Sequence, residues 1–563
     1  MSEHTHKERM QARLGALSSE RSSWVNQWRE ISENIMPITG RFFTSDRNKG
    51  QNRFSRIYDN TGTIAARTLA AGMLGGLTSP ARPWFRLKTG DAALDEFQPV
   101  KMWLAQVTRT MQGIFADSNT YRALHSIYME LGLYGTAADT MLDDFDTGIW
   151  HYGHTAGEYM LATDYRGVVN TFYREFDKTV AQLVNEFGYK NCSTHVRTMY
   201  DQGSLDQWVT IVHAVEPRAD RDTRKRDSKN MAYSSCYFEK GSDDQKQLLR
   251  ESGFDRFRVL APRWITVGQD VYGQSPGMEV LGDVRQLQHE QTRKSQGIDY
   301  QTRPPLQAPT SMKHQVVDGL PGGVTFVDST GNNAGIRPSW EAQINLNYLL
   351  EDIRDVRQRI QSGFYSDLFL MLSGQDTTRM TATEVAERHE EKLLMLGPVL
   401  ERLHNELLDP LVEITFDRML RAGVVPPPPD ELNGMALNVD FVSLLAQAQR
   451  AVANNTTDRF VGNLGVVAQM KPEVLDKFDA DQWADSYSDQ MGVDPSLIVA
   501  DEQVAIIRQQ RAQAQQAAAQ QEQAAQMAES AAKLGTIDTS GRNAAADIMN
   551  QLQGYNSPGA QSY

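Results

Sequence analysis

Three aspartates in one short segment are the best candidates in this sequence for metal chemistry. Asp143, Asp144 and Asp146 fall within four consecutive residues, and clustered carboxylates are the ligands that hold Mg²⁺ in nucleases. Aspartate is also favoured in tight turns, because its side chain hydrogen-bonds to the nearby backbone. We expect a turn between a helix and a strand here, and a metal-dependent nucleic-acid-processing enzyme is the alternative interpretation.

Two histidines form a second candidate, since His151 and His154 stand in the motif HYGH within a strand-like segment. No cysteine or carboxylate set near them completes a four-ligand metal site. His389, in RHEEKL, does not form the H-E-x-x-H motif of zinc proteases. The sequence also has no G-x-x-x-x-G-K-[ST] loop and no G-x-S-x-G elbow. We therefore expect no enzyme, no metal and no cofactor, and instead a structural or conduit role.

Composition indicates an ordinary folded chain of several domains. The 563 residues are 40% hydrophobic and 23% charged, which is too apolar for a disordered protein. Only Cys192 and Cys236 are present, so a disulfide scaffold is excluded, and we expect both thiols to be reduced and buried. No membrane span or export signal is expected. The net charge of −14 argues against a protein that clamps duplex DNA, but not against one that lets DNA pass.

Apolar periodicity predicts helices in the N-terminal part of the chain and mixed strands after it. We expect an amphipathic helix over 7–36, with an apolar stripe of Met10, Leu14, Leu17, Trp24, Trp28, Ile31 and Ile35. The helix expected after 58–62 is rich in Ala and Gly, which suggests close approach to another helix. Two helices are expected within 100–142, and strands with one helix (178–187) over 149–275. Residues 218–229 carry six basic and three acidic groups. We expect them to form a solvated hairpin tip, and a nucleic-acid patch is the alternative.

Two further helices, expected over 283–300 and 340–362, flank an insert rich in Pro and Gly. The second helix has a narrow apolar stripe of Leu349, Ile353, Val356 and Ile360. A stripe this narrow suits packing on neighbouring copies of the chain better than a thick private core. The pattern therefore predicts an oligomer.

The remainder of the chain alternates polar loops with helices. A Thr- and Gly-containing loop at 373–380 precedes a helix that reaches about 421, which Pro398 and Pro410 should kink or break. Gly423 ends this helix, and the run VVPPPP follows as a stiff linker. We expect a small helical region over 437–500. Residues 505–534 are rich in Ala and Gln and predict a long polar helix, with disorder in the free subunit as the alternative.

An ordered series of segments resembles the portal, or head-to-tail connector, proteins of short-tailed bacteriophages. The series includes YDNTGTIAARTLAAGMLGGLTSPARPWFRL, SNTYRALHSIYMELGLYGTAADTML, FDKTVAQLVNEFG, HAVEPR, RWITVGQDVYGQSPGMEVLGDVRQLQ and TATEVAERHEEKLLMLGPVLERLHNELLDPLVEITFDRMLRAG. It covers residues 55–425. No single segment is decisive, but unrelated chains do not share such an ordered set.

The resemblance implies an α+β portal fold with a mainly helical wing, a two-helix stem, a small clip insert, a helical crown and a C-terminal helical barrel. The corresponding divisions of this sequence are the N-terminal wing (1–280), stem helix 1 (281–301), clip (302–339), stem helix 2 (340–362), tunnel loop and kinked wing helix (363–429), crown (430–504), and barrel helix and tail (505–563).

The resemblance also implies a structural ring, usually of twelve subunits, at one capsid vertex of the virion, assembled in the host cytoplasm. The ring is the channel for genome packaging and ejection. The implied partners are double-stranded DNA without sequence specificity, the large terminase, the major capsid and scaffolding proteins, and then a tail adaptor and internal ejection proteins, with no membrane. Within the tunnel loop, Arg379 is the best candidate for a DNA contact, followed by Thr377, Thr378 and Gln375, and by Lys392 in the next helix. Another ring-forming virion protein, such as a tail adaptor, is the alternative, although adaptors are usually much shorter.

Overall fold

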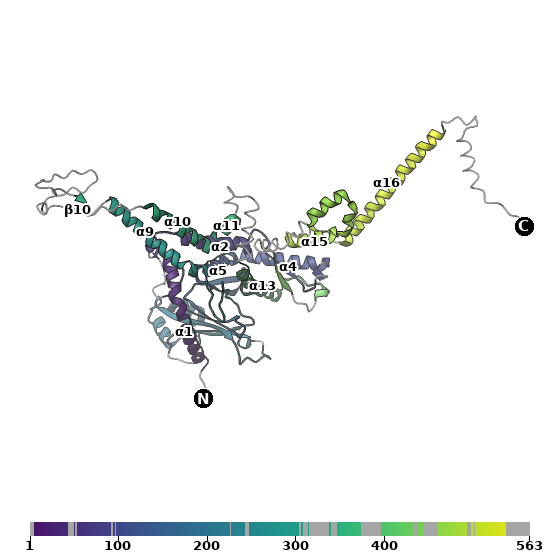
Figure 1. The fold of residues 1–563 in the computed structure, drawn as a ribbon. Coiled ribbons are helices and arrows are strands. Elements are labelled where there is room, and N and C mark those ends of the chain that lie inside the picture. The colour runs from purple at the N-terminus through teal and green to yellow at the C-terminus, as the bar shows by residue number, and fades with distance from the viewer. Residues whose placement is uncertain are drawn as a thin grey trace, which may run out of the picture. The chain divides into compact units, whose positions relative to one another are not determined.

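The structure is a computed structural model. It describes residues 5–42, 50, 53–91, 94–95, 97–225, 227–242, 247–302, 306–307, 314, 337–338, 346–372, 396–432, 437–443, 460–491, 497–499 and 501–535. The chain divides into two compact units, Met1–Gly492 and Val493–Tyr563. Helices and antiparallel sheets both contribute to the first unit, which confirms the α+β class (Figure 1).

Helices form the first part of the chain, largely as predicted. They are α1 (His6–Asn34), α2 (Thr61–Leu77), α4 (Gln98–Asp117) and α5 (Thr120–Tyr134). A capping box starts α1: Glu8 N–H donates to Thr5 Oγ1, and Thr5 N–H donates to the Glu8 carboxylate. The predicted stripe of α1 is buried except at Trp24, which is partly buried. Close approach predicted for α2 is also confirmed, because a Cβ at Gly72 would overlap the ring of Phe369.

The last helix predicted within 100–142 ends earlier than expected. α5 stops at Tyr134 because Gly135 adopts a left-handed conformation (φ 73°) as its C-cap. Ala138–Asp144 then forms strand β2, which pairs with β3 (Gly148–His154) on one side and with β9 (Val259–Leu260) on the other. The acidic cluster thus lies between two strands, and the expectation of a helix before it was wrong.

A five-stranded antiparallel sheet follows, with the order β4-β5-β6-β7-β8. Its strands are β4 (Tyr159–Thr163), β5 (Val169–Thr179), β6 (Trp208–Pro217), β7 (Tyr233–Glu239) and β8 (Arg250–Phe254). Between β5 and β6 lie the predicted helix α6 (Val180–Phe187) and an unpredicted short helix, α7 (Thr194–Asp201). Met10, Leu14 and Leu17 of α1 cover one face of this sheet.

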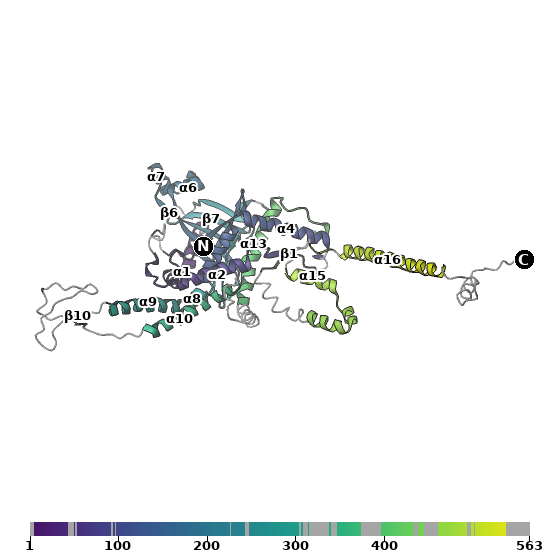
Figure 2. The same ribbon diagram turned by 90° about the horizontal axis from the view of Figure 1, so that it is seen from above.

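Two helices then run side by side, as Figures 1 and 2 show. After α8 (Pro276–Glu279) comes α9 (Leu281–Thr302), and α10 (Leu346–Gly363) returns before α11 (Ser366–Leu372). Between them, β10 (Leu306–Gln307) pairs antiparallel with β11 (Arg337–Pro338). The chain segments that leave α9 and lead back towards α10 are therefore paired with each other at these residues.

The helix predicted to reach about 421 changes its hydrogen-bonding pattern at Pro410. Residues 396–403 are α-helical, His404–Leu408 form a π-helical turn, and α13 (Asp409–Arg421) follows with Pro410 in its first turn. Proline lacks the N–H that a regular α-helix needs, so a break here is expected. Gly423 (φ 68°) then ends the helix, because Val424 N–H donates to Met419 O.

The segment after the polyproline run is not helical at its start. Asn438–Phe441 form strand β12, which pairs antiparallel with β1 (Phe85–Lys88). Phe441 stacks on Trp84 and His404. The prediction of helix from 437 is wrong for these residues, because their pairing partner lies more than 300 residues earlier. Helical structure follows at 460–470 and in α15 (Ala480–Met491), and the described 3-10 turns are Arg53–Arg56, Tyr189–Asn191, Ser228–Asn230, Asp430–Leu432 and Pro472–Lys477.

The second unit contains one long helix, α16 (Asp501–Gly535). At 1.5 Å per residue its 35 residues extend about 52 Å. Its side chains are exposed over almost all of 503–527, so the predicted Ala/Gln helix is confirmed and has no buried face within the described chain. None of the described helices is both long and apolar enough to cross a membrane.

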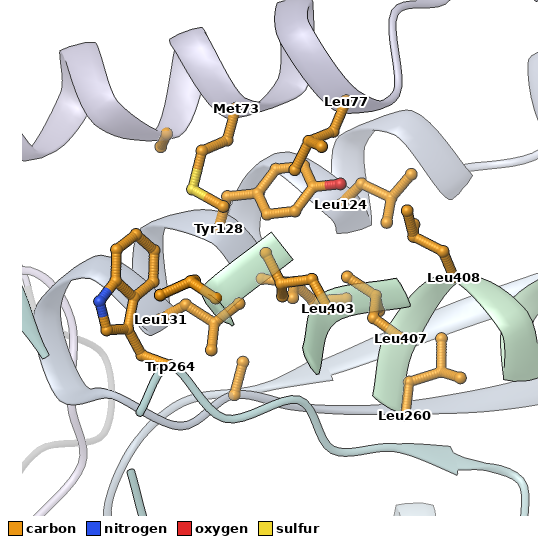
Figure 3. Packing of buried hydrophobic residues seen from close by; sticks show 14 of the residues in the cluster. Met73, Leu77, Leu124, Tyr128, Leu131, Leu260, Trp264, Leu403, Leu407 and Leu408 are labelled. Atoms are coloured by element: carbon orange, nitrogen blue, oxygen red, sulfur yellow. The ribbon is translucent and has the colours of Figure 1, made fainter. Parts of the chain in front are cut away.

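The main hydrophobic core joins segments that are far apart in the sequence. Figure 3 shows Met73 and Leu77 of α2 facing Leu124, Tyr128 and Leu131 of α5. Leu403, Leu407 and Leu408 of the π-turn helix approach the same cluster from the other side. The helix that contains Leu403, Leu407 and Leu408 is thereby fixed to the N-terminal helices α2 and α5.

Candidate functional site

The paired helices α9 and α10 pack against each other through an apolar seam. Ile353, Val356 and Ile360 of α10 are at most 2% exposed. They join Val284 and Leu287 of α9 in the main core, and α2 also contacts α10. The prediction that this stripe packs on neighbouring copies is therefore wrong. Helix α2, far away in the sequence, already supplies the third side that a narrow stripe needs.

Asp59 anchors both paired helices at their base. Its carboxylate accepts hydrogen bonds from Arg357 of α10 (Nη2, 2.7 Å; Nε, 3.1 Å), from Gln291 of α9 (2.9 Å) and from the Thr61 hydroxyl (2.5 Å). Burial alone would raise the pKa of Asp59, but the hydrogen bonds from Thr61 and Arg357 outweigh it and hold that pKa below its ordinary value. Asp59 is therefore charged at neutral pH and fixes α10 beside α9.

Gln288 closes the same anchor from α9. Its Oε1 accepts from the backbone N–H of Tyr58 (2.7 Å) and of Asp59 (3.0 Å), and its Nε2 donates to Asp59 O (2.7 Å). Every hydrogen-bonding atom of this side-chain amide is used, so the turn before α2 is held against the helix pair. Sequence reasoning treated YDNTG only as a helix start. The signal that sequence reasoning missed was the pair of Asp59 in YDNTG and Arg357, which lies next to Val356 in the apolar stripe of α10.

The contact between α9 and α10 also carries charge. Arg359 of α10 bridges Asp283 of α9 (3.1 Å) and Asp355 one turn earlier in α10 (3.3 Å). Glu290 of α9 is buried beside Asp352 of α10, and burial, reinforced by that neighbouring carboxyl, raises the pKa of Glu290. The two helices are thus held by an apolar seam with ionic groups along its edge.

A buried ion pair fixes the π-turn helix to the sheet region. Glu406, within the π-turn, accepts from Arg263 at Nη2 (2.6 Å), Nε (3.2 Å) and the backbone N–H (2.9 Å). Arg402 donates to the same carboxylate (3.1 Å). Arg263 is buried and also donates to Gly167 O (2.7 Å). The π-helical turn before Pro410 therefore places the Glu406 carboxylate beside Arg263. Arg263 in turn links this helix to the turn that contains Gly167.

A second buried carboxyl, Glu130 of α5, fastens the loop after β3. It accepts from Thr155 Oγ1 (2.7 Å) and from the N–H of Ala156 (3.0 Å). Complete burial raises the pKa of Glu130 to about 7, against an ordinary value of 4.5. The same loop holds the segment after α1, because Arg41 N–H donates to Ala156 O (2.8 Å).

The residues proposed from sequence as DNA contacts lie outside the described residues. They are Arg379, Thr377, Thr378, Gln375 and Lys392, in the stretch 373–395. Their role in the tunnel loop stays a prediction.

The acidic cluster lies at the end of β2 and in the turn that follows it, so the expected turn is present but it joins two strands. Asp144 Oδ2 accepts from both the N–H (2.9 Å) and the hydroxyl (2.7 Å) of Thr147. Asp143 is paired with Arg258 (2.9 Å) and with Arg418. Two arginines thus already pair with the Asp143 carboxylate, and the three aspartates form no metal-ligating group among the described residues.

The histidine pair is divided between two different partners. His151 Nδ1 hydrogen-bonds to Asp139 (2.6 Å), whereas His154 lies between Thr140 (Nε2, 2.8 Å) and Arg174 (Nδ1, 3.2 Å). Burial, followed by the charge of Arg174, lowers the pKa of His154 well below its ordinary value, so the ring is neutral. Within the described part of the chain, no three His, Cys, Asp or Glu side chains gather around a common metal position.

The basic segment 218–229 and the two cysteines both agree with the structural roles expected for them. Described residues of the 218–229 segment form an exposed connection between β6 and β7, where Arg218 pairs with Glu251 (3.1 Å), which agrees with a solvated hairpin tip. Cys192 and Cys236 are free and buried, as predicted, and they belong to two different hydrophobic clusters.

Comparison with known proteins identifies the family. Residues 7–499 match the family described as "Bacteriophage head to tail connecting protein". The chain belongs to this family. It is 60% identical over 555 residues to a probable portal protein of Bordetella phage BPP-1, covering 99% of this chain and all of that protein. It is 46% identical over 507 residues to the portal protein of Salmonella phage epsilon15, covering 90% and 91% of the two chains.

These comparisons confirm the resemblance seen in the sequence, and the chain is a head-to-tail connector of a phage virion. A chain in a solved structure titled "Neck of empty GTA particle computed with C6 symmetry" is similar at 12% identity with a TM-score of 0.34, over 76% of this chain and 92% of that one.

Proposed function

We propose that twelve copies of the chain close into a ring at one capsid vertex, and that DNA enters and leaves the head through this ring. The observation that carries the proposal is similarity along nearly the whole chain to proteins named as portals, rather than at one motif. The same observation favours a portal over a tail adaptor, which is usually a much shorter chain. We propose that the ring has no catalytic role of its own.

The helix pair supports an assignment of parts. We propose that α9 and α10 are the stem, that 302–339 between them is the clip, that 373–380 is the tunnel loop, that 430–504 is the crown and that α16 begins the barrel. Antiparallel pairing of Leu306 with Pro338 supports the clip, because an insert closed at its base can form one protruding unit. The anchor at Asp59 supports a rigid stem.

Net charge supports a mechanism in which DNA slides. Twelve copies of a chain with net charge −14 carry a formal charge of −168. A negative channel repels phosphates, so DNA is not trapped, and isolated cations such as Arg379 make only brief, salt-sensitive contacts. These contacts need no base sequence, because they reach the phosphate backbone alone.

The proposed partners follow from the position at a vertex. The large terminase supplies ATP-driven force and docks on the clip during packaging. A tail adaptor and internal ejection proteins use the same surface later, and capsid and scaffolding proteins surround the wing while the head assembles in the host cytoplasm. Electron micrographs of the purified chain test the proposal: rings with a central hole are expected, and a uniform population of monomers would contradict it.

A further inference from the structure

Two carboxyl groups meet across the seam between α9 and α10. The helices run antiparallel, because the residue before α9 packs against the last residue of α10. Asp283 of α9 pairs with Arg359 of α10 (3.1 Å) and fixes their register. Glu290 follows seven residues later in α9, and Asp352 stands seven residues earlier in α10. Seven residues make about two helical turns, so this register places Glu290 opposite Asp352.

Glu290 is buried, and one of its carboxyl oxygens has no donor. The residue is 8% exposed. Gln286 Nε2 donates to Oε1 (2.6 Å), whereas Oε2 is shielded from solvent and accepts no hydrogen bond from any described residue. A hydrogen bond between Glu290 and Asp352 needs a proton on one of the two carboxyls, since a carboxylate cannot donate. Burial, with the Asp352 carboxyl adding to it, raises the pKa of Glu290. The pair therefore keeps a proton at pH values at which an exposed glutamate is ionised.

The charged groups around this pair are engaged elsewhere. Arg359 is the cation that lowers the pKa of Glu290, and it is already shared between Asp283 and Asp355. Within the described helices packed here, no lysine or arginine forms an ion pair with Glu290 or Asp352. The other groups with partners are Glu30 with Arg285, Glu33 with Arg56, Asp59 with Arg357, and Arg293 with His289 and Gln296. Those without an ion pair to either carboxyl include Arg67, Glu279, Lys294, Glu351 and Arg354.

The acidic pair lies at the end of the apolar seam. The buried apolar residues between it and the Asp283–Arg359 contact are Val284, Leu287, Ile353 and Val356. Beyond Glu290, the only buried residue of α9 is Gly297, and no described residue of α10 before Ile353 is buried. The outer parts of the two helices therefore have little apolar surface to hold them together, and local opening is easiest where few apolar contacts are buried.

We propose that Glu290 and Asp352 share one proton, and that loss of this proton loosens the outer parts of the helix pair, residues 291–302 of α9 and 346–352 of α10. A shared proton makes a charge-assisted hydrogen bond between the carboxyls, which holds the helices together. Without it, two like charges face each other in a partly buried seam and repel. The apolar part of the seam stays closed. The acidic pair is thus a pH-sensitive contact, and its bearing on a stem rests on the proposed function.

Hydrogen exchange tests this contact directly. In the wild type, amide exchange of 291–302, corrected for the chemical exchange rate, should be about threefold or more faster at pH 8 than at pH 5. Glu290→Gln and Asp352→Asn each supply a neutral amide that can donate to the remaining carboxyl, so each should remove that difference. Glu351→Gln is the matched control, because Glu351 is an exposed carboxyl next to Asp352. It should keep the wild-type difference.

Three results would overturn the shared proton. The first is exchange of 291–302 in the wild type that does not change between the two pH values. The second is a pH dependence that persists in Glu290→Gln or in Asp352→Asn. The third is protection at pH 5 that disappears when EDTA is added, which would assign the bridge to a divalent cation. The measurement needs no ring, so failure of the ring proposal is seen separately, in the mass of the same sample.

Discussion

Arg357 donates two hydrogen bonds to one oxygen of Asp59, from Nη2 at 2.7 Å and from Nε at 3.1 Å, across 298 residues of sequence. The aspartate side chain is almost fully buried and the arginine half-exposed. This contact holds the turn before α2 against α10. An early segment of the chain therefore helps to fix the position of α10, one of the two proposed stem helices.

Removing that anchor should destabilise the first unit. Asp59→Ala leaves Arg357, Gln291 and Thr61 without their acceptor, and we expect a loss of about 2–3 kcal/mol in the free energy of unfolding. Glu30→Gln is the control, because its partner Arg285 (3.1 Å) forms an exposed pair worth less than about 1 kcal/mol. Urea unfolding followed by tryptophan fluorescence measures both. Equal, small effects of the two substitutions would show that Asp59 does not anchor the helices.

Glu130 should make stability depend on pH in a definite direction. Its pKa is about 7 in the folded chain and near 4.5 when unfolded. The folded state therefore holds the proton more tightly, and stability falls as pH rises from about 4.5 to about 7, by roughly 3 kcal/mol in all. Glu130→Gln cannot ionise, so thermal unfolding measured from pH 5 to pH 8 should show a flatter profile than the wild type. A variant with the unchanged profile would exclude Glu130 as the source.

The C-terminal helix should be dispensable for assembly. Deleting residues 505–563 removes most of α16, whose side chains are exposed over almost all of the described stretch. We expect rings to form as before while genome retention or ejection is impaired. Micrographs of the truncated chain, together with nuclease protection of the genome in virions that carry it, separate the two effects. Loss of rings on truncation would make the helix part of the assembly core.

Arg379 should matter for DNA and not for assembly, if the tunnel-loop assignment is right. Arg379→Glu reverses one charge per subunit and should weaken retention of packaged DNA, with a defect that changes with salt concentration. Lys392→Glu, the weaker candidate, should have the smaller effect. Retained genome is measured in virions at several ionic strengths, beside ring counts in micrographs. A variant unable to form rings would assign Arg379 to a subunit contact instead.

Local patterns predicted local structure well. The stripe from Met10 to Ile35 predicted α1, and Pro410 predicted the break that appears as the π-turn at His404–Leu408. Gly423 predicted the end of α13. In each case the cause lies within a few residues of the effect, which is the range that periodicity and capping can reach.

Contacts between distant segments could not be predicted from the sequence. Asn438–Phe441 is a strand only because Phe85–Lys88 lies beside it, and the stripe of α10 is covered by α2. Asp59 and Glu406 looked like ordinary polar residues, since their arginine partners lie 298 and 143 residues away. The family was recognisable because it depends on an ordered series of segments, not on any one contact.

The mass of the assembled chain tests the central claim most directly. Twelve subunits of 63.2 kDa should give a single species of about 760 kDa by light scattering after size exclusion, with a closed ring and a central hole in micrographs of the same fraction. A single species at the monomer mass across micromolar concentrations, at physiological salt and with no rings visible, would contradict the account.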